Sequence, residues 1–460
     1  MQPGTLLTLD IEKPAAGGRM LARHHGQVVL VSGAIPGERV SARVERAGKG
    51  VIYADTAQVL SASPDRRGDV GDWRCGGNVL AFIDYPRQLR LKGQIIQDAL
   101  ARIGRVPLAS PPEVIGSPEH GYRMRARLHA ANGRVGFFRE GTHVLCGAAP
   151  TRQLADATNA WLVRVEELLA RDSLSGLAAV ELSENIGGER ACHLELHAGV
   201  DASGYTALAE GLTGLSAARA DRAGVEVLAG TPSVVDSLAI PGTPEGAPYA
   251  GHPVQSSVGH PVPSSAGHPV QSSVGHPFKG AVVRLQRDVR AFFQGNRFLL
   301  ESLVHHVRSL VGPGPVVDLY AGVGLFGLSL AAAGAPGVIV VEGDPVSGAD
   351  LRQNAEPFGE RVRVERRSVE QFLALIRDRS EDLTGSTIIV DPPRTGMTRE
   401  ALAGTIARKP GRIVYVSCDV ATFARDSRTL IDAGYELGEL TGVDLFPNTA
   451  HVESIAVFGR

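Results

Sequence analysis

Apolar and polar residues alternate along the first 62 residues of the chain, and glycine and proline interrupt the alternation at short intervals. Two stretches, 27–31 and 39–44, alternate as β-strands do, and Pro36 and Gly37 lie between them. Several short strands in so short a segment are typical of a small β-barrel. The pattern therefore predicts an N-terminal barrel over residues 1–62.

After a polar stretch at residues 61–72, the apolar residues recur at the spacing of a helix. Residues 85–103 place apolar side chains at helical spacing among arginine, lysine, glutamine and aspartate, which predicts an amphipathic helix. Strand patterns follow at 123–130 and 134–138, and a second helical pattern covers 154–169. This mixture predicts an α+β domain after the barrel.

An internal repeat lies within this central domain, which we expect to span residues 63–290. Residues 251–278 repeat a unit of eight residues, and each full unit contains His-Pro and Ser-Ser. Four regularly spaced histidines could bind a metal ion, but a tandem duplication in a tolerant loop is the favoured interpretation. Because the repeat has little to bury, we expect a flexible surface insertion.

Strands alternate with helices over residues 291–460, which predicts a third domain with a parallel, doubly wound sheet. The predicted helices cover 297–311 and 326–333. The predicted strands are 316–320, 337–342, 387–390, 412–416 and 453–459.

Composition narrows the class of protein. The chain has 460 residues, 43% of them hydrophobic, and a net charge of −2, so a substantial core is expected and any nucleic-acid contact must use local basic patches. No apolar run reaches the roughly 20 residues that span a bilayer, and no secretory signal is expected. Only 4 cysteines occur. These features predict a cytoplasmic protein with reduced cysteines that does not enter a membrane.

A glycine-rich turn follows one predicted strand. Gly322-Val-Gly-Leu-Phe-Gly327 has the spacing that lets a backbone approach a ligand at a helix N-terminus. Glu342 ends the next predicted strand, where a carboxylate can accept hydrogen bonds from ribose hydroxyls. The motif fits a nicotinamide or flavin dinucleotide, S-adenosylmethionine, or simply a tight turn.

Further chemically active side chains end the later strands. Asp391-Pro-Pro-Arg394 follows one, and Cys418 follows the next, at the edge of the sheet where ligands bind in such folds. A lone cysteine is more often a buried apolar residue than a nucleophile, and a lone Glu453 would more often be a surface residue. Their combination indicates a nucleoside-type cofactor beside a covalent nucleophile.

Together these motifs resemble the RNA 5-methyluridine methyltransferase family, which acts on uridines in tRNA and large-subunit rRNA. The first 62 residues resemble the TRAM domain, a small RNA-binding barrel often fused to this family. The similar motifs, in the family's order, are Phe292-Phe-Gln-Gly-Asn296, Asp318-Leu-Tyr-Ala-Gly-Val-Gly324, Asp391-Pro-Pro-Arg-Thr-Gly396, Ser417-Cys-Asp419 and Phe446-Pro-Asn-Thr-Ala-His-Val-Glu453.

The resemblance implies a role for each motif. Cys418 would attack carbon 6 of uracil, which makes carbon 5 nucleophilic, and Glu453 would remove the proton from carbon 5 after methyl transfer. S-adenosylmethionine would be held by Gln294, Tyr320, Gly322, Glu342 and Asp391. The target uridine would first be turned out of its stack.

The resemblance leaves the target open. The barrel favours large-subunit rRNA, and tRNA is the alternative. A nicotinamide-dependent oxidoreductase would use the glycine-rich turn, but it leaves Asp391, Cys418 and Glu453 without a joint role. A non-catalytic RNA-binding assembly factor would need neither Cys418 nor Glu453. We expect a monomer that binds RNA.

One departure from the family concerns an iron–sulfur cluster that many members carry on four cysteines. Cys75 and Cys146 match two of the ligand positions, whereas Asp69 and Asn78 occupy the other two. Because such clusters are held by thiolates, we predict no stable cluster and no other metal.

Overall fold

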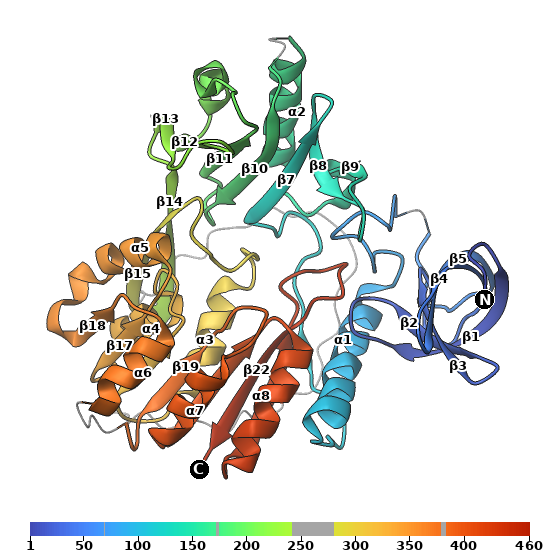
Figure 1. Ribbon diagram of the computed structural model, residues 1–460. Coiled ribbons are helices and arrows are strands. Elements are labelled where there is room, and N and C mark those ends of the chain that lie inside the picture. Colours follow the sequence, from blue (N-terminus) through green and yellow to red (C-terminus); the bar gives the residue numbers. More distant parts are fainter. Residues whose placement is uncertain (69, 172–173, 242–279, 379–382) are drawn as a thin grey trace, which may run out of the picture.

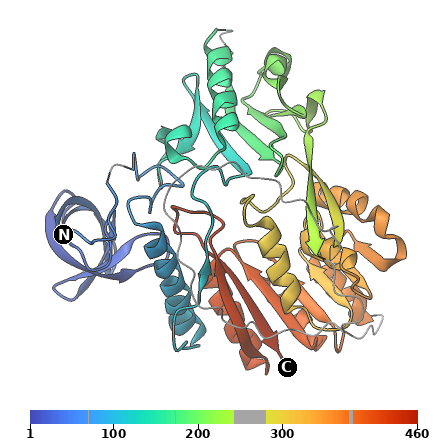
Figure 2. The same ribbon diagram turned by 180° about the vertical axis from the view of Figure 1, so that it is seen from behind.

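The computed structural model describes residues 1–68, 70–171, 174–241, 280–378 and 383–460. The repeat at 251–278 and Asp69 lie outside the described residues. The chain forms three regions, and both views show the barrel beside the long sheet of the C-terminal region, with the central sheet above them (Figures 1 and 2). This architecture confirms the predicted fold class.

The N-terminal region is a closed barrel whose strand order is β1-β2-β3-β5-β4. Along β1, the side chains of Leu7, Leu9 and Ile11 are buried and those between them are exposed, because successive side chains of a strand point to opposite faces. The strands are β1 (Leu6–Pro14), β2 (Met20–His24), β3 (Gln27–Ser32), β4 (Arg39–Ala47) and β5 (Val51–Ser61).

A long helix, α1 (Tyr85–Ala99), lies between the barrel and the C-terminal sheet (Figure 1). It continues into a π-helical turn over Leu100–Gly104, so the predicted helix over 85–103 is confirmed. Its contacts include strand β1 of the barrel and strands and a helix of the C-terminal region. Two of its buried residues are polar, Gln88 and Lys92, and both face the C-terminal region.

The central region is a seven-stranded sheet in the order β13-β12-β11-β10-β7-β8-β9. Helix α2 (Asp156–Arg171) packs on it, and a two-stranded ribbon leads to the C-terminal region. The sheet strands are β7 (Arg125–Ala131), β8 (Arg134–Phe138), β9 (Leu145–Gly147), β10 (Leu177–Glu184), β11 (Arg190–Leu196), β12 (Gly214–Arg219) and β13 (Glu226–Gly230). The ribbon strands are β14 (Ser233–Pro241) and β15 (Gly280–Asp288).

The C-terminal region has an eight-stranded sheet in the order β18-β17-β16-β19-β20-β22-β21-β6. Its strands are β6 (Val114–Ile115), β16 (Val316–Leu319), β17 (Val338–Val341), β18 (Val362–Glu365), β19 (Thr387–Val390), β20 (Arg412–Ser417), β21 (Glu436–Val443) and β22 (Glu453–Gly459). Its helices are α3 (Leu300–Leu310), α4 (Leu325–Ala332), α5 (Pro345–Ala355), α6 (Val369–Asp378), α7 (Arg399–Ala407) and α8 (Val420–Asp432).

The last strand departs from the predicted parallel sheet. Strands β18, β17, β16, β19 and β20 are parallel, but β22 is antiparallel to both of its neighbours, β20 and β21. The reason lies in the connection, because β21 leads to β22 through a loop with no helix, and a parallel pair needs a long crossover. None of the helices in the described part of the chain has the length and hydropathy to cross a bilayer.

Candidate active site

A cavity of about 670 Å³ opens at the carboxyl edge of the parallel strands. Four of the predicted site residues directly follow a strand: Tyr320 follows β16, Glu342 follows β17, Asp391 follows β19 and Cys418 follows β20. All four line the cavity, together with Gln294, Gly322 and Glu453. The structure therefore brings every predicted site residue to one place.

The direction of β22 decides where Glu453 lies. Glu453 is the first residue of β22, and Ser454 pairs with Ser417 at the end of β20. In a parallel strand the first residue would lie at the opposite edge of the sheet. Because β22 is reversed, Glu453 instead lies at the edge that carries Cys418.

The glycine-rich turn after β16 is held by close contacts with residues at the end of β17. The backbone N–H of Gly322 donates to Oε2 of Glu342 at 2.7 Å. A Cβ on Gly327 would come within 2.5 Å of Val340, so glycine lets α4 pack directly on the sheet. Tyr320 has a φ of +63°, an unusual backbone conformation for a residue with a side chain, and such residues cluster at functional sites.

Gln294 and Asp391 form a polar pair on the wall of the cavity. The amide Nε2 of Gln294 donates to Oδ2 of Asp391 at 3.1 Å. Burial raises the pKa of Asp391 to about 7, and the hydrogen bond from Gln294 lowers it in part. Burial also raises the pKa of Glu342, which ends the neighbouring strand, although backbone N–H groups donate to both of its oxygens.

Burial raises the pKa of both Cys418 and Glu453. Burial, followed by the Glu453 and Asp391 carboxyls, raises the pKa of the Cys418 thiol to about 11, and Arg394 opposes this rise in part. Burial and Asp391 raise the pKa of Glu453 well above its ordinary value. Oε1 of Glu453 is buried and has no hydrogen-bond partner among the described residues. A buried, unpaired carboxyl oxygen in a cavity is suited to exchange a proton with a ligand.

Two further residues have roles that the sequence motifs did not reveal. Asp318 is fully buried, accepts a hydrogen bond from the N–H of Gly327 at 2.7 Å, and has its pKa raised to about 8 by burial. Its buried carboxyl therefore fixes the backbone at the end of the glycine-rich turn. Arg394, quoted in a motif without a role, lines the cavity as a cation near the thiol and Glu453.

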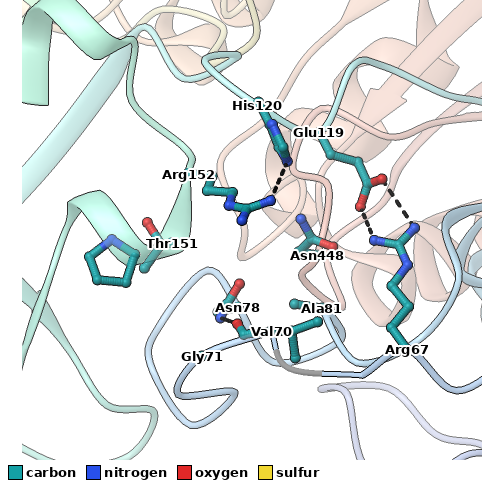
Figure 3. A pocket seen from close by; sticks show the side chains of 11 residues that line it. Arg67, Val70, Gly71, Asn78, Ala81, Glu119, His120, Thr151, Arg152 and Asn448 are labelled. Carbon is teal, nitrogen blue, oxygen red and sulfur yellow. Dashed lines mark hydrogen bonds and ion pairs between the residues drawn. The ribbon is translucent and has the colours of Figure 1, made fainter. Parts of the chain in front are cut away.

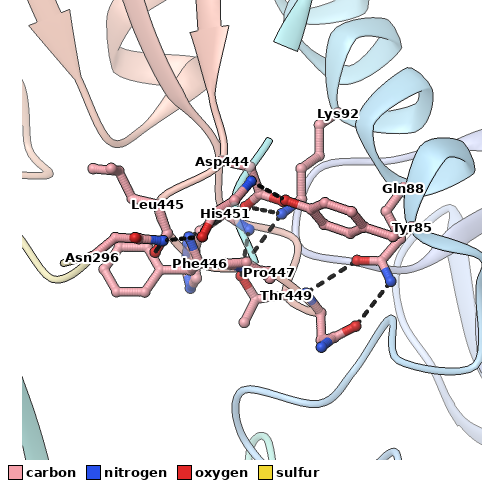
Figure 4. A network of polar contacts seen from close by, with 12 residues as sticks. Tyr85, Gln88, Lys92, Asn296, Asp444, Leu445, Phe446, Pro447, Thr449 and His451 are labelled. Carbon is pink, nitrogen blue, oxygen red and sulfur yellow. Dashed lines mark hydrogen bonds and ion pairs between the residues drawn. The ribbon is translucent and has the colours of Figure 1, made fainter. Parts of the chain in front are cut away.

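The loop between β21 and β22 is held by helix α1 (Figure 4). The buried ammonium of Lys92 donates to Oδ1 of Asp444 at 2.5 Å and to the carbonyl oxygen of Phe446 at 3.1 Å. Gln88 donates to Oδ1 of Asn448 at 2.9 Å and accepts from its backbone N–H at 3.0 Å. These contacts were not predicted, because they join positions far apart in the sequence.

The central region reaches the same loop. The guanidinium of Arg123 lies 5.5 Å from the centre of the Phe446 ring, which lines the cavity. The side chain of Asn296 donates to the carbonyl oxygen of Leu445 at 3.2 Å. The loop that leads to Glu453 is therefore contacted from α1, from the central region and from the segment that carries Gln294.

Comparisons with known proteins identify the family. The family model for tRNA (uracil-5-)-methyltransferase matches residues 285–460, and that for the TRAM domain matches residues 2–56. A 23S rRNA (uracil(1939)-C(5))-methyltransferase of Azoarcus is 30% identical over 98% of this chain and 99% of its own length. The chain belongs to the RNA uracil-C5 methyltransferase family. The corresponding enzyme of Shewanella amazonensis is 29% identical over 98% of this chain and 95% of its own length.

A solved structure shares the whole fold. The tRNA (uracil-54, C5)-methyltransferase of Pyrococcus abyssi, in complex with S-adenosyl-L-homocysteine, superposes with a TM-score of 0.71 and 22% identity, covering 98% of this chain and 99% of that one. This likeness shows the shared fold, and membership of the family makes the chain an S-adenosylmethionine-dependent RNA methyltransferase. The cavity fits the cofactor, because it combines the partly buried Glu342 carboxylate at a strand end with a glycine-rich turn.

The cysteines outside the cavity correct one expectation. Cys75 and Cys146 form a disulfide, so the prediction that all cysteines are reduced is wrong for this pair. Their Cα atoms lie 6.0 Å apart, a separation that a disulfide spans. Cys192 and Cys418 are free, and Cys192 is buried.

The same pair does not fit an iron–sulfur cluster. Both sulfurs are bonded to each other, and the Asn78 amide donates to the carbonyl oxygens of Val70 and Asp72. The absence of a cluster stays a prediction. Iron analysis of anaerobically purified protein tests it, and stoichiometric iron would contradict it.

Proposed function

We propose that the methyltransferase modifies carbon 5 of one uridine in large-subunit rRNA, with Cys418 as the nucleophile and Glu453 as the base. The observation that carries this proposal is the shared cavity. A half-buried thiol and a buried carboxyl with an unpaired oxygen lie there beside the Gln294–Asp391 pair. Carbon 5 chemistry needs each of these groups.

The thiol acts first. The Cys418 thiolate bonds to carbon 6 of uracil, and the electron pair of the 5,6 double bond moves so that carbon 5 becomes nucleophilic. Bound S-adenosylmethionine supplies the electrophilic methyl group that carbon 5 accepts. Because the thiol has a pKa of about 11, its proton must pass to water as the ligands bind, and Arg394 favours the thiolate that remains.

The carboxyl acts last. Glu453 takes the proton from carbon 5, the double bond re-forms, and the bond from Sγ of Cys418 to carbon 6 breaks. A base for this step must be able to accept a proton inside a water-poor cavity. The raised pKa of Glu453 increases its proton affinity, which supports this assignment.

We propose that Gln294, Tyr320, Gly322, Glu342 and Asp391 hold the methyl donor. Glu342 ends β17, where a carboxylate is placed to accept hydrogen bonds from ribose hydroxyls, and its two oxygens are already oriented by backbone N–H groups. Replacing Glu342 with Gln should weaken binding of S-adenosylhomocysteine, measured by titration calorimetry, while RNA affinity stays unchanged.

Covalent trapping tests the assignment of the nucleophile. RNA carrying 5-fluorouridine at the target position keeps fluorine on carbon 5, which cannot leave as a proton does, so the adduct persists. The wild-type enzyme with S-adenosylmethionine should yield a covalent protein–RNA complex on a denaturing gel, and Cys418→Ala should yield none. Normal methylation by Cys418→Ala would refute the mechanism.

The rRNA target is supported by relatives that match end to end. The Azoarcus and Shewanella amazonensis enzymes, both named for 23S rRNA, align over 95% or more of both chains. Mapping 5-methyluridine in RNA from cells with and without the gene tests this choice, and loss of the mark only from tRNA would establish the alternative. We further propose a monomer that works in the cytoplasm, which size-exclusion chromatography with light scattering and cell fractionation test.

A further inference from the structure

A second cavity, of about 290 Å³, also borders the loop between β21 and β22, which contributes Asn448 to its lining (Figure 3). Its walls come from the segment between the barrel and α1, from two loops of the central region, and from Asn448 of the loop itself. None of the proposed catalytic or cofactor residues lines it. The reaction described above therefore leaves this cavity without a role.

One wall presents a hydrogen-bond acceptor. Asn78 is only 4% exposed, and its Nδ2 donates to the carbonyl oxygens of Val70 at 3.1 Å and Asp72 at 3.4 Å. These two acceptors fix the orientation of the amide. Its Oδ1 has no donor among the described residues, and the side chain lies at the cavity (Figure 3).

The opposite wall presents a donor. Asn448 is 6% exposed, and its Oδ1 accepts from Nε2 of Gln88 at 2.9 Å. The same Nε2 donates to the carbonyl oxygen of Ile83 at 2.9 Å, so the orientation of both amides is determined. Nδ2 of Asn448 is left without an acceptor in the part of the chain that the structure describes.

The rim carries a cation. Arg152 is exposed, and its Nη1 lies 3.4 Å from Nε2 of His120, with no carboxylate paired to it within the described ranges. Arg67 differs, because both of its terminal nitrogens donate to Glu119, at 2.7 and 3.1 Å. One arginine is thus neutralised within the wall, while the other can bind an anion at the mouth.

We propose that this cavity binds a second nucleotide of the RNA substrate, one that flanks the target uridine. Asn78 and Asn448 would contact the edge of its base, and Arg152 its phosphate. The Watson–Crick edge of every base presents donors beside acceptors, which a free amide oxygen and a free amide nitrogen complement. The volume is at the lower end of that of ligand sites, which suits a single nucleotide, and proteins bind splayed-out bases of single-stranded RNA in this way.

The loop connects this nucleotide to the reaction. Phe446 lines the active-site cavity and Asn448 lines the second one. They are two residues apart, so their Cα atoms are separated by at most about 7 Å. A short RNA segment can therefore occupy both cavities, which share the loop that leads to Glu453.

Paired changes in RNA and protein test this inference, which rests on the proposed function. The probe is a transcript of the rRNA segment in which the methylated uridine has been mapped, with one flanking position at a time made abasic. For the wild-type enzyme, one flanking abasic position should raise KM for RNA about tenfold, with kcat unchanged. The larger side chain in Ala81→Leu fills the cavity, so KM for intact RNA should already be raised in this variant. The same abasic position should then raise its KM no further.

An exposed position provides a second variant that does not disturb the core. Arg152 has a φ of +56°, and asparagine tolerates this conformation, so Arg152→Asn should fold and raise KM about fivefold to tenfold. The salt dependence of RNA binding should also fall, by about 0.7 in the slope of log K against log salt concentration. Arg105→Asn is the matched control, since Arg105 is exposed with a φ of +53° and lies outside the cavity. It should change neither KM nor the slope.

The outcomes separate this inference from the proposed function. The second nucleotide site is refuted if each abasic position raises KM equally in the wild-type enzyme and in Ala81→Leu, and if Arg152→Asn changes KM no more than Arg105→Asn does. Methylation itself would stand. If the wild-type enzyme does not methylate the unmodified transcript, the proposed target is wrong instead.

Discussion

The two cavities that border the β21–β22 loop differ in how burial acts on their charged groups. In the active-site cavity, burial raises the pKa of Cys418, Asp391 and Glu453, and one carboxyl oxygen has no partner among the described residues. In the second cavity, Arg67 is paired with Glu119 and Arg152 is exposed to solvent. Proton transfer needs groups whose proton affinity burial has raised, whereas binding needs groups that keep their ordinary charge.

The comparison also shows what the shared loop must do. It carries Phe446 on the active-site side and Asn448 on the other, and α1 holds it through Lys92 and Gln88. A loop between two ligand sites has to be rigid for either ligand to be positioned. We call the contacts of Lys92 and Gln88 with the loop the clamp. Variants in either cavity and in the clamp should therefore have distinct effects.

The largest effect is expected from the nucleophile. Cys418→Ala should lower kcat by about 10⁴-fold or more, because no other group among the cavity residues can form the bond to carbon 6. RNA affinity, measured by filter binding, should stay within about twofold of the wild type, since binding uses other surfaces. A large loss of RNA affinity with only a small loss of kcat would contradict this prediction, because Cys418 would then serve binding and not bond formation.

The proposed base should have the next largest effect. Glu453→Gln keeps the shape of the side chain but cannot accept the carbon 5 proton, so turnover should fall about 10²–10⁴-fold. Elimination should slow more than attack, and a covalent protein–RNA adduct should accumulate with an ordinary uridine substrate. A denaturing gel during turnover measures this. Loss of turnover without adduct would place Glu453 before the bond to carbon 6 instead.

The clamp should control stability. Lys92→Met leaves the Asp444 carboxyl buried without its partner, which should lower the free energy of unfolding by about 3–5 kcal/mol in urea titrations. The double variant Lys92→Met with Asp444→Leu should regain much of this loss. The control is Lys13→Met in the exposed pair with Asp98, which should cost at most about 1 kcal/mol. Equal losses in the buried and the exposed pair would show that the clamp contributes nothing.

The smallest effect concerns the thiol itself. With a pKa of about 11, the rate of Cys418 alkylation by iodoacetamide should rise about tenfold per pH unit between pH 7 and 9. The sulfonium cation of S-adenosylmethionine should lower that pKa by roughly 1–3 units, whereas uncharged S-adenosylhomocysteine should not. Mass spectrometry identifies the alkylated residue, since Cys192 is buried and the other two cysteines are bonded. Equal acceleration by both ligands would exclude an electrostatic cause.

Much of the site could be predicted from the sequence, because the ends of apolar runs mark the ends of strands. Tyr320, Glu342, Asp391 and Cys418 each follow an apolar run, and parallel strands end at the same edge of a sheet. The barrel and the helix at 85–103 were equally readable, since their periods are local properties of the chain. The clamp was not, because Lys92 and Asp444 lie 352 positions apart.

The sequence by itself determined which residue types follow which strands, and that was sufficient to indicate the family. The tertiary structure decided that Glu453 shares a cavity with Cys418. The pattern at 453–459 predicts a strand but carries no information about its direction, since side-chain alternation is the same in both. Only the connection through a loop and the pairing of β22 between β20 and β21 reverse it. The second cavity likewise exists only because three distant segments of the chain meet around Asn448.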